Sequence, residues 1–134
     1  MPKKRYRYWI KRFLPALLFS SLLGTYLDLI MVGKQLYAFP IRPLPAIFSI
    51  NLLFTLVGLP FVTFIFLFLM GRWGKWGRAV GIVCFSLGMA VLERKAEDFG
   101  LFVHSHSWSH LNTFIGYGLF LLVVHRFHEW IKLM

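Results

Sequence analysis

Residues 46–70 read AIFSINLLFTLVGLPFVTFIFLFLM and form the most hydrophobic part of this chain. The segment carries no charged residue and exceeds the roughly 20 apolar residues that an α-helix needs to cross a bilayer. Pro60 lies in its middle, two residues after Gly58, and removes a backbone donor there. We therefore expect a membrane-spanning helix with a kink, in which Thr55, Thr63 or neighbouring helices satisfy the freed carbonyl.

The composition of the whole chain agrees with this interpretation. Of the 134 residues, 58% are hydrophobic and only 15% are charged, whereas about a quarter of the residues in a soluble domain are charged. This composition predicts a polytopic membrane protein with a single domain. Cys84 is the only cysteine, so no internal disulfide can form.

The net charge of +10 comes from basic residues at the ends of the apolar segments rather than from a basic surface. Lysine and arginine in such places bind anionic lipid head groups. We therefore expect membrane lipid, with anionic head groups at the cytoplasmic face, as a partner, and no nucleic acid. A homo- or hetero-oligomer is compatible with the composition.

Outward from residues 46–70, three further apolar segments complete the predicted architecture. The expected fold is all-α, a transmembrane bundle of four helices over residues 13–134 preceded by a basic interfacial arm over residues 1–12. The predicted spans are about 13–32, 46–70, 79–98 and 109–124.

The connections between these spans carry clear signals. Residues 33–35 end the first span, and three prolines within residues 37–45 keep the next connection extended. Residues 71–78 form a tight basic turn, and Gly100 stops the third helix. Ser107 or Ser109 is expected to cap the fourth helix.

The distribution of lysine and arginine predicts the orientation of the bundle. With four spans, eleven basic residues fall on the side of the two termini and four on the opposite side. The excess of positive charge marks the cytoplasmic side, so both termini are predicted to be cytoplasmic.

Four polar side chains are predicted to lie at one depth in the membrane. With a rise of about 1.5 Å per residue, Asp28 and Glu93 lie about 24 and 22 Å from the inner face. Asn51 and Asn112 lie about 8 Å below the outer face. Because an acid exposed to lipid is costly, we expect these four residues to form a polar pocket that opens outward.

The connection from residue 93 to residue 110 holds most of the residue types that could do chemistry. Glu93 and Glu97 are four residues apart and share a helix face. His106 and His110 share a face as well if the fourth helix begins early, whereas His104 is expected in water. Imidazoles and carboxylates suit zinc or another divalent first-row metal, so these five residues are candidate metal ligands.

The remaining histidines, His125 and His128, are expected at the inner membrane boundary. No histidine occurs in the first three predicted spans, so two axial haem ligands within one subunit are not expected. No residue is predicted to bind an organic cofactor, and no catalytic motif is recognisable.

Three interpretations of the polar layer compete. In the structural one, Asp28 or Glu93 pairs with Arg94, Lys95 or an amide and fixes the register of the helices. In the second, the glutamates and histidines bind a divalent metal, although their spacing matches no established zinc signature. In the third, Asp28 or Glu93 carries protons or cations in a coupled transporter.

Several motifs resemble a family of small polytopic membrane proteins of endospore-forming Gram-positive bacteria that has no assigned activity. The motifs are LGTYLD (23–28), LYAFPIRP (36–43), FSIN (48–51), ERKAE (93–97) and FVHSHSWSH (102–110). The resemblance covers most of the chain after the basic arm. It implies a multi-pass protein of the bacterial plasma membrane and supplies no catalytic residues.

The leading functional expectation is a non-enzymatic membrane component, such as an accessory subunit of a larger assembly. It follows from the small size, the lack of a catalytic motif and the basic cytoplasmic face. A metal-binding protein or metalloenzyme at the outer face is the first alternative, and a coupled transporter is the second.

Overall fold

The structure, a computed structural model, describes the backbone of residues 2–133 and the side chains of residues 7–133. Its helices are α1 (Pro2–Gly33), the π-helical segment η1 (Phe54–Gly58), α2 (Leu59–Met70), α3 (Lys75–Asp98) and α4 (His110–Lys132), and its strands are β1 (Tyr37–Ala38) and β2 (Val103–His104). The all-α prediction is confirmed. The predicted basic arm is the start of α1, and the side chains of Lys3, Lys4 and Arg5 lie outside the described residues.

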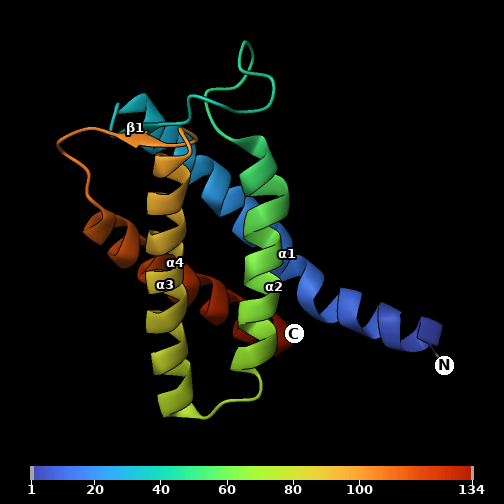
Figure 1. The fold of residues 1–134 in the computed structure, drawn as a ribbon. Helices are drawn as coiled ribbons and strands as arrows, with labels where there is room; N and C mark the ends of the chain where they lie inside the picture. The colour runs from blue at the N-terminus through green and yellow to red at the C-terminus, as the bar shows by residue number, and fades with distance from the viewer. Residues whose placement is uncertain (1, 134) are drawn as a thin grey trace.

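The helices pack as a bundle, and the strands β1 and β2 pair as a small antiparallel β-ribbon at one end (Figure 1). The strands β1 and β2 and the loop that precedes α2 lie at the top of this view, and the turn between α2 and α3 lies at the bottom. Helix α1 projects beyond the bundle toward the N-terminus, whereas α4 crosses behind α3. The bundle therefore has one end built of irregular connections, and the candidate site lies there.

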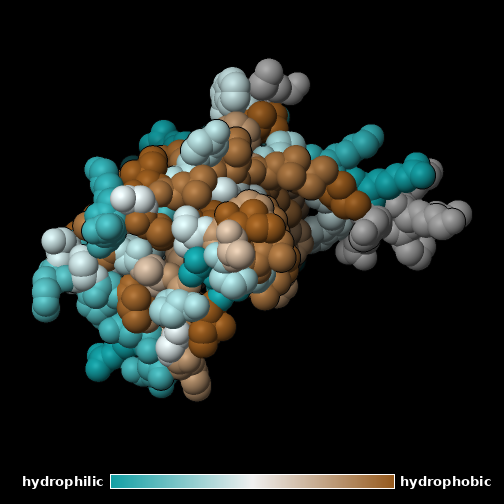
Figure 2. Space-filling model, turned by 90° about the horizontal axis from the view of Figure 1, so that it is seen from above, coloured by the Kyte–Doolittle hydropathy of each residue, from teal (hydrophilic) through white to brown (hydrophobic). Residues whose placement is uncertain are grey.

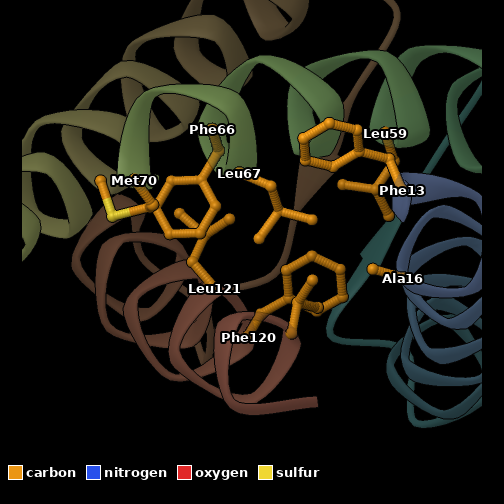
Figure 3. Close-up of a cluster of buried hydrophobic side chains, with 9 residues drawn as sticks. Phe13, Ala16, Leu59, Phe66, Leu67, Met70, Phe120 and Leu121 are labelled. Atoms are coloured by element: carbon orange, nitrogen blue, oxygen red, sulfur yellow. The ribbon is translucent and has the colours of Figure 1, made fainter. Parts of the chain in front are cut away.

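The core forms where α1, α2 and α4 meet (Figure 3). Phe13 and Ala16 of α1, Phe66 and Leu67 of α2, and Leu121 of α4 are all nearly inaccessible and point toward one another. Burying an apolar side chain of this size contributes about 1.5–3 kcal/mol when the alternative is water. This core holds the half of the bundle away from the ribbon.

The second helix begins later than predicted. Residues 46–51 are turns and bends, and regular helix starts only after Asn51, whose Oδ1 accepts a hydrogen bond from the backbone N–H of Phe54 at 3.2 Å. Asparagine is a preferred N-cap because its side chain satisfies a free N–H of the first turn. The predicted start at residue 46 was wrong because hydropathy does not distinguish an apolar loop from an apolar helix.

The loop before this helix is organised by Arg42. Its guanidinium donates to the backbone carbonyls of Phe39, Pro45 and Phe48, at 2.7, 3.1 and 2.6 Å. These bonds satisfy carbonyls that the proline-rich segment cannot pair in a helix or a sheet. Arg42, counted in the sequence only as an external charge, therefore determines the shape of the loop.

The helix changes its hydrogen-bond pattern just before Pro60, in the π-helical turn η1, and the predicted kink stays a prediction. The N–H of Leu59 donates to the carbonyl of Phe54, five residues earlier, and α2 follows with Pro60 in its first turn. A proline is tolerated there because the first helical residues need no intrahelical donor.

The threonines near Pro60 do not act as expected. Thr55 Oγ1 donates to the carbonyl of Leu52 at 3.4 Å, and Thr63 Oγ1 has no hydrogen-bond partner among the described residues. Neither hydroxyl reaches the carbonyl of Leu56, which the proline would leave free.

Two helices are long and apolar enough to cross a membrane. They are residues 7–33 of α1 and residues 75–98 of α3, while the combined helix over residues 54–70 is apolar but shorter. Helix α3 begins at Lys75, four residues before the predicted start, and ends near residue 98 as predicted. The prediction of a membrane protein with apolar helices is supported at this level.

Every helix also leaves apolar side chains on its outer face. Figure 2 shows hydrophobic groups at the surface of the ribbon end, between hydrophilic ones. Exposed examples on the four helices are Leu18, Leu22, Phe61, Ile65, Val80, Leu87, Leu111 and Leu119. Small polar side chains lie inside instead, namely Ser20, Thr55, Thr63, Ser86 and Thr113.

The ends of the helices at the ribbon follow the sequence signals. Gly100 has a φ of +77°, and its N–H donates to the carbonyl of Glu97, so it ends α3 in the left-handed conformation that glycine favours. Ser109 caps α4, because its side chain accepts from the N–H of Asn112 at 3.4 Å. Both predictions are confirmed.

Candidate functional site

A cavity of about 680 Å³ lies beneath the ribbon, between all the helices. Asp28, Asn51, Glu93 and Asn112, the four residues of the predicted polar pocket, all line it. Asn51 uses its side chain to cap the second helix, and Asn112 lies in the first turn of α4. The two acids have other partners.

Asp28 is held by a tyrosine from the ribbon. The hydroxyl of Tyr37 in β1 donates to Asp28 Oδ1 at 2.6 Å, while Asp28 Oδ2 is buried without a partner among the described residues. Burial and the nearby Asp28 carboxylate keep the pKa of Tyr37 above its usual range. The hydroxyl therefore stays protonated and remains the donor of this bond.

The ribbon positions Tyr37 at this point. Tyr37 pairs with His104 across the two antiparallel strands, and the N–H of Ser105 donates to the carbonyl of Leu36. The ring of Tyr37 also packs edge-on against Trp108, with centroids 5.0 Å apart. The β-ribbon therefore positions both Tyr37, which donates to Asp28, and His104, which lies beside Glu97.

Glu93 is the acceptor at the end of a directed hydrogen-bond chain. The indole Nε1 of Trp108 donates to Thr113 Oγ1 at 3.1 Å, and the Thr113 hydroxyl donates to Glu93 Oε2. An indole can only donate, so the direction of both bonds follows. The same Glu93 oxygen lies 2.8 Å from His110 Nδ1.

Glu97, His104 and His110 form the second cluster. Glu97 Oε2 lies 2.9 Å from His104 Nδ1 and 3.5 Å from His110 Nε2, and the two imidazole centroids are 5.2 Å apart. One ligand atom from each of the three side chains falls within 4.8 Å of the others. All three side chains are half-buried, so solvent reaches the cluster.

His110 lies between two carboxylates, with Glu93 on the Nδ1 side and Glu97 on the Nε2 side. Because Nδ1 faces the Glu93 carboxylate, the proton of a neutral imidazole lies on Nδ1. The lone pair on Nε2 then faces Glu97 Oε2 at 3.5 Å, an arrangement that favours a cation between them.

His106, the fifth candidate ligand, does not join this group. It is exposed in the loop before α4, because that helix begins only at His110 and the two histidines never share a face. The helix starts where it was predicted, with Ser109 as its cap, so the condition for His106 and His110 to share a face is not met. His104, expected in water, is instead half-buried in β2.

The expected ion pairs with Arg94 and Lys95 are not formed. Both basic side chains are exposed, and neither lies within ion-pair distance of an acid among residues 7–133. They point away because Glu93 and Glu97 occupy the inner face of α3. The acids pair with histidines, a tyrosine and a threonine instead.

His125 and His128 are buried within the structure, and their place at the inner membrane boundary stays a prediction. The His128 ring stacks on Phe13 with centroids 5.2 Å apart, and His125 lies edge-on to Phe66. Both Nδ1 atoms lack a partner among the described side chains. The two rings therefore act as aromatic packing between α4 and the core.

The sequence did not predict that Tyr37, Trp108 and Thr113 belong to the site. Trp108 and Thr113 lie among the candidate residues in sequence, and Tyr37 opens the proline-rich segment. No helix or strand pattern signals these pairings, because Tyr37 lies nine residues from Asp28 and Thr113 twenty from Glu93, and Trp108 precedes the helix that holds Thr113.

Comparisons with protein-family models, curated proteins and solved structures found no match to this chain. The family resemblance of the motifs therefore stays a prediction.

Proposed function

We propose that the chain is a four-span plasma-membrane protein, with both termini cytoplasmic, that binds a divalent first-row metal ion such as zinc at its outer end. The ligands are Glu97, His104 and His110. The observation that carries the proposal is the convergence of these three side chains from α3, β2 and α4 within 4.8 Å.

The ligand set suits zinc chemically. Two histidines and one glutamate with an open fourth position are an established ligand set for catalytic zinc. Tetrahedral ligands about 2.0–2.2 Å from zinc lie about 3.4 Å from one another. Small rotations of three half-buried side chains would bring their donor atoms to that spacing.

Glu93 supports this role from behind His110. A metal-bound histidine nearly always donates its other ring N–H to a carboxylate or carbonyl, which orients the ring. His110 Nδ1 lies 2.8 Å from Glu93 Oε2 while Nε2 is directed toward Glu97. The hydroxyl of Thr113 donates to Glu93, and the indole of Trp108 donates to Thr113. These two further hydrogen bonds hold the Glu93 carboxylate in place behind His110.

Length and hydropathy support spans at α1 and α3, and the two further spans are proposed from exposed apolar faces. Helix α4 has 23 residues, about 34 Å at the usual rise, and exposes Leu111, Ile115 and Leu119. The helix over residues 54–70 exposes Phe61 and is about 25 Å long. Contiguous apolar faces of this kind are rare on soluble monomers, and small polar residues between helices are typical of membrane bundles.

Metal binding is preferred to a purely structural role because of Glu97. A structural network needs only the bonds of Glu93, which already links α3 to α4. Glu97 brings a second carboxylate to the same His110 and to His104, with solvent access. The proposal is compatible with a non-enzymatic membrane component, and no catalytic residue is assigned.

The test measures metal in the full-length protein purified in detergent. After incubation with zinc and desalting, we expect about one metal ion per chain in the parent and almost none in His110→Ala. His106→Ala is the matched control, because it removes a histidine of the same loop that lies outside the cluster. It should keep the metal.

Glu93→Gln keeps the three ligands and changes only the group behind His110. We expect zinc to bind about 10–100-fold more weakly in this variant. A parent protein without stoichiometric metal, or equal metal in His110→Ala and His106→Ala, would overturn the proposal.

A further inference from the structure

The cavity beneath the ribbon has a polar end and an apolar end. Asn112 lies in the first turn of α4, and Val123 lies eleven residues further along the same helix; both line the cavity. At about 1.5 Å per residue, the cavity wall follows α4 for about 16 Å. Apolar side chains such as Leu23, Met89 and Phe120 make the far part of that wall.

The size and lining are those of a ligand site. Pockets for small molecules are typically about 300–1,000 Å³, with mostly apolar walls and a few placed polar groups. At about 680 Å³ this cavity falls within that range. The arrangement suits an amphiphile, with its chain along α4 and its head beneath the ribbon.

The mouth of the cavity has an apolar edge. Leu92, Leu119 and Val123 line the cavity and are still 57%, 61% and 47% exposed. A route into the cavity from the membrane rests on the four-span arrangement proposed above, in which an opening bordered by exposed leucine and valine faces hydrocarbon rather than water. A ligand would therefore enter sideways from the membrane.

The charges at the polar end select the head of the ligand. Asp28 and Glu93 are acidic, and no lysine or arginine lines the cavity among the described residues. Asp28 Oδ2 is a buried acceptor with no partner among residues 7–133. A buried acceptor of this kind gains from a donated hydrogen bond, and a phosphate head would be repelled by both acids.

We propose that this cavity binds a membrane lipid without a negative charge, such as a diacylglycerol, whose head hydroxyl donates to Asp28 and one of whose two acyl chains lies along α4. The inference goes beyond the proposed metal site, because it uses Asp28 and the cavity wall rather than Glu97 or the histidines.

Two glycines allow a matched test of the cavity. A Cβ added to Gly116 or to Gly88 meets no atom within 4 Å, but only Gly116 lines the cavity. Gly116→Leu therefore adds a side chain at the cavity wall, with room for its Cβ, whereas Gly88→Leu adds the same side chain on α3 away from the cavity. Both changes favour the helix equally.

The experiment incubates each full-length protein in detergent with dioleoylglycerol or with dioleoylphosphatidylglycerol and measures the retained lipid by native mass spectrometry. We expect the parent to retain at least ten times more of the neutral lipid. Gly88→Leu should behave as the parent, Gly116→Leu should lose retention, and Asp28→Asn should lose most of the preference.

Equal retention of the two lipids by the parent, or unchanged retention in Gly116→Leu, would overturn the proposal. Metal content is measured in the same preparations. Because Gly116 does not belong to the glutamate–histidine cluster, its variant should keep the metal, so failure of the lipid site and failure of the metal site are distinguishable.

Discussion

At the scale of single residues, the site depends on carboxylates that accept hydrogen bonds from side chains of other segments. Asp28 accepts a hydrogen bond from the hydroxyl of Tyr37. Glu93 accepts one from the hydroxyl of Thr113 and faces Nδ1 of His110. Buried acids without such donors are costly, and more so in a membrane. The ribbon therefore supplies the donor to Asp28, and α4 supplies the partners of Glu93.

The bond between Tyr37 and Asp28 can be tested by its effect on stability. Tyr37→Phe removes the only donor to Asp28 among the described residues and leaves both carboxylate oxygens unpaired. We expect a loss of about 1–3 kcal/mol in the free energy of unfolding, measured by chemical denaturation in detergent. Tyr26→Phe is the control, because Tyr26 is exposed on the same face of α1 as Leu18 and Leu22.

In the double variant Asp28→Asn/Tyr37→Phe, the loss should be smaller than the sum of the two single losses, since the two side chains share one interaction. Strictly additive losses would contradict a direct bond between them.

At the scale of the elements, the approach of α1 to the second helix is set by Gly24. A Cβ at this position would lie 2.2 Å from Leu59 Cδ2, so no larger residue fits without movement of Leu59. Leu59 is buried at the junction between η1 and α2. The close contact therefore couples α1 to the point where the second helix changes its hydrogen-bond pattern.

Gly24→Leu should accordingly destabilise the bundle. Overpacking at a tight helix contact typically costs about 1–3 kcal/mol, and we expect a loss in this range by the same denaturation measurement. Gly88→Leu introduces the same side chain into a helix where the added Cβ meets nothing within 4 Å. Equal stability of the two variants would contradict the contact.

At the scale of the whole molecule, the arrangement proposed in the membrane places the ribbon outside and the turn between α2 and α3 inside. The two ends of the molecule in Figure 1 carry these features. The basic residues gather at the termini and the turn, as the positive-inside rule requires for this orientation.

Cysteine labelling in intact cells tests this orientation. In a Cys84→Ala background, a cysteine at Ser105 should react with a membrane-impermeant maleimide added outside. A cysteine at Gly74 should react only after the cells are opened; an added Cβ at Gly74 meets nothing within 4 Å, so this control is tolerated. Reaction of the Ser105 cysteine from the cytoplasmic side alone would overturn the orientation.

The sequence by itself determined the helical class and most of the helix ends, and it predicts the depth of the polar residues in the membrane. Hydropathy follows directly from composition, and depth follows from a constant rise per residue. Gly100 and Ser109 could be assigned because their roles are local, within one turn of the helix. The start of the second helix was misplaced because its cap, Asn51, lies inside an apolar segment.

Only the tertiary structure decided which of the polar residues meet. The bonds from Tyr37 to Asp28 and from His110 to Glu93 join segments that are 9 and 17 residues apart, across turns whose path no local pattern encodes. The exclusion of His106 and the burial of His128 depend likewise on where α4 begins and how it is rotated. Side-chain partners at the site follow from the relative placement of the helices, which long-range packing determines.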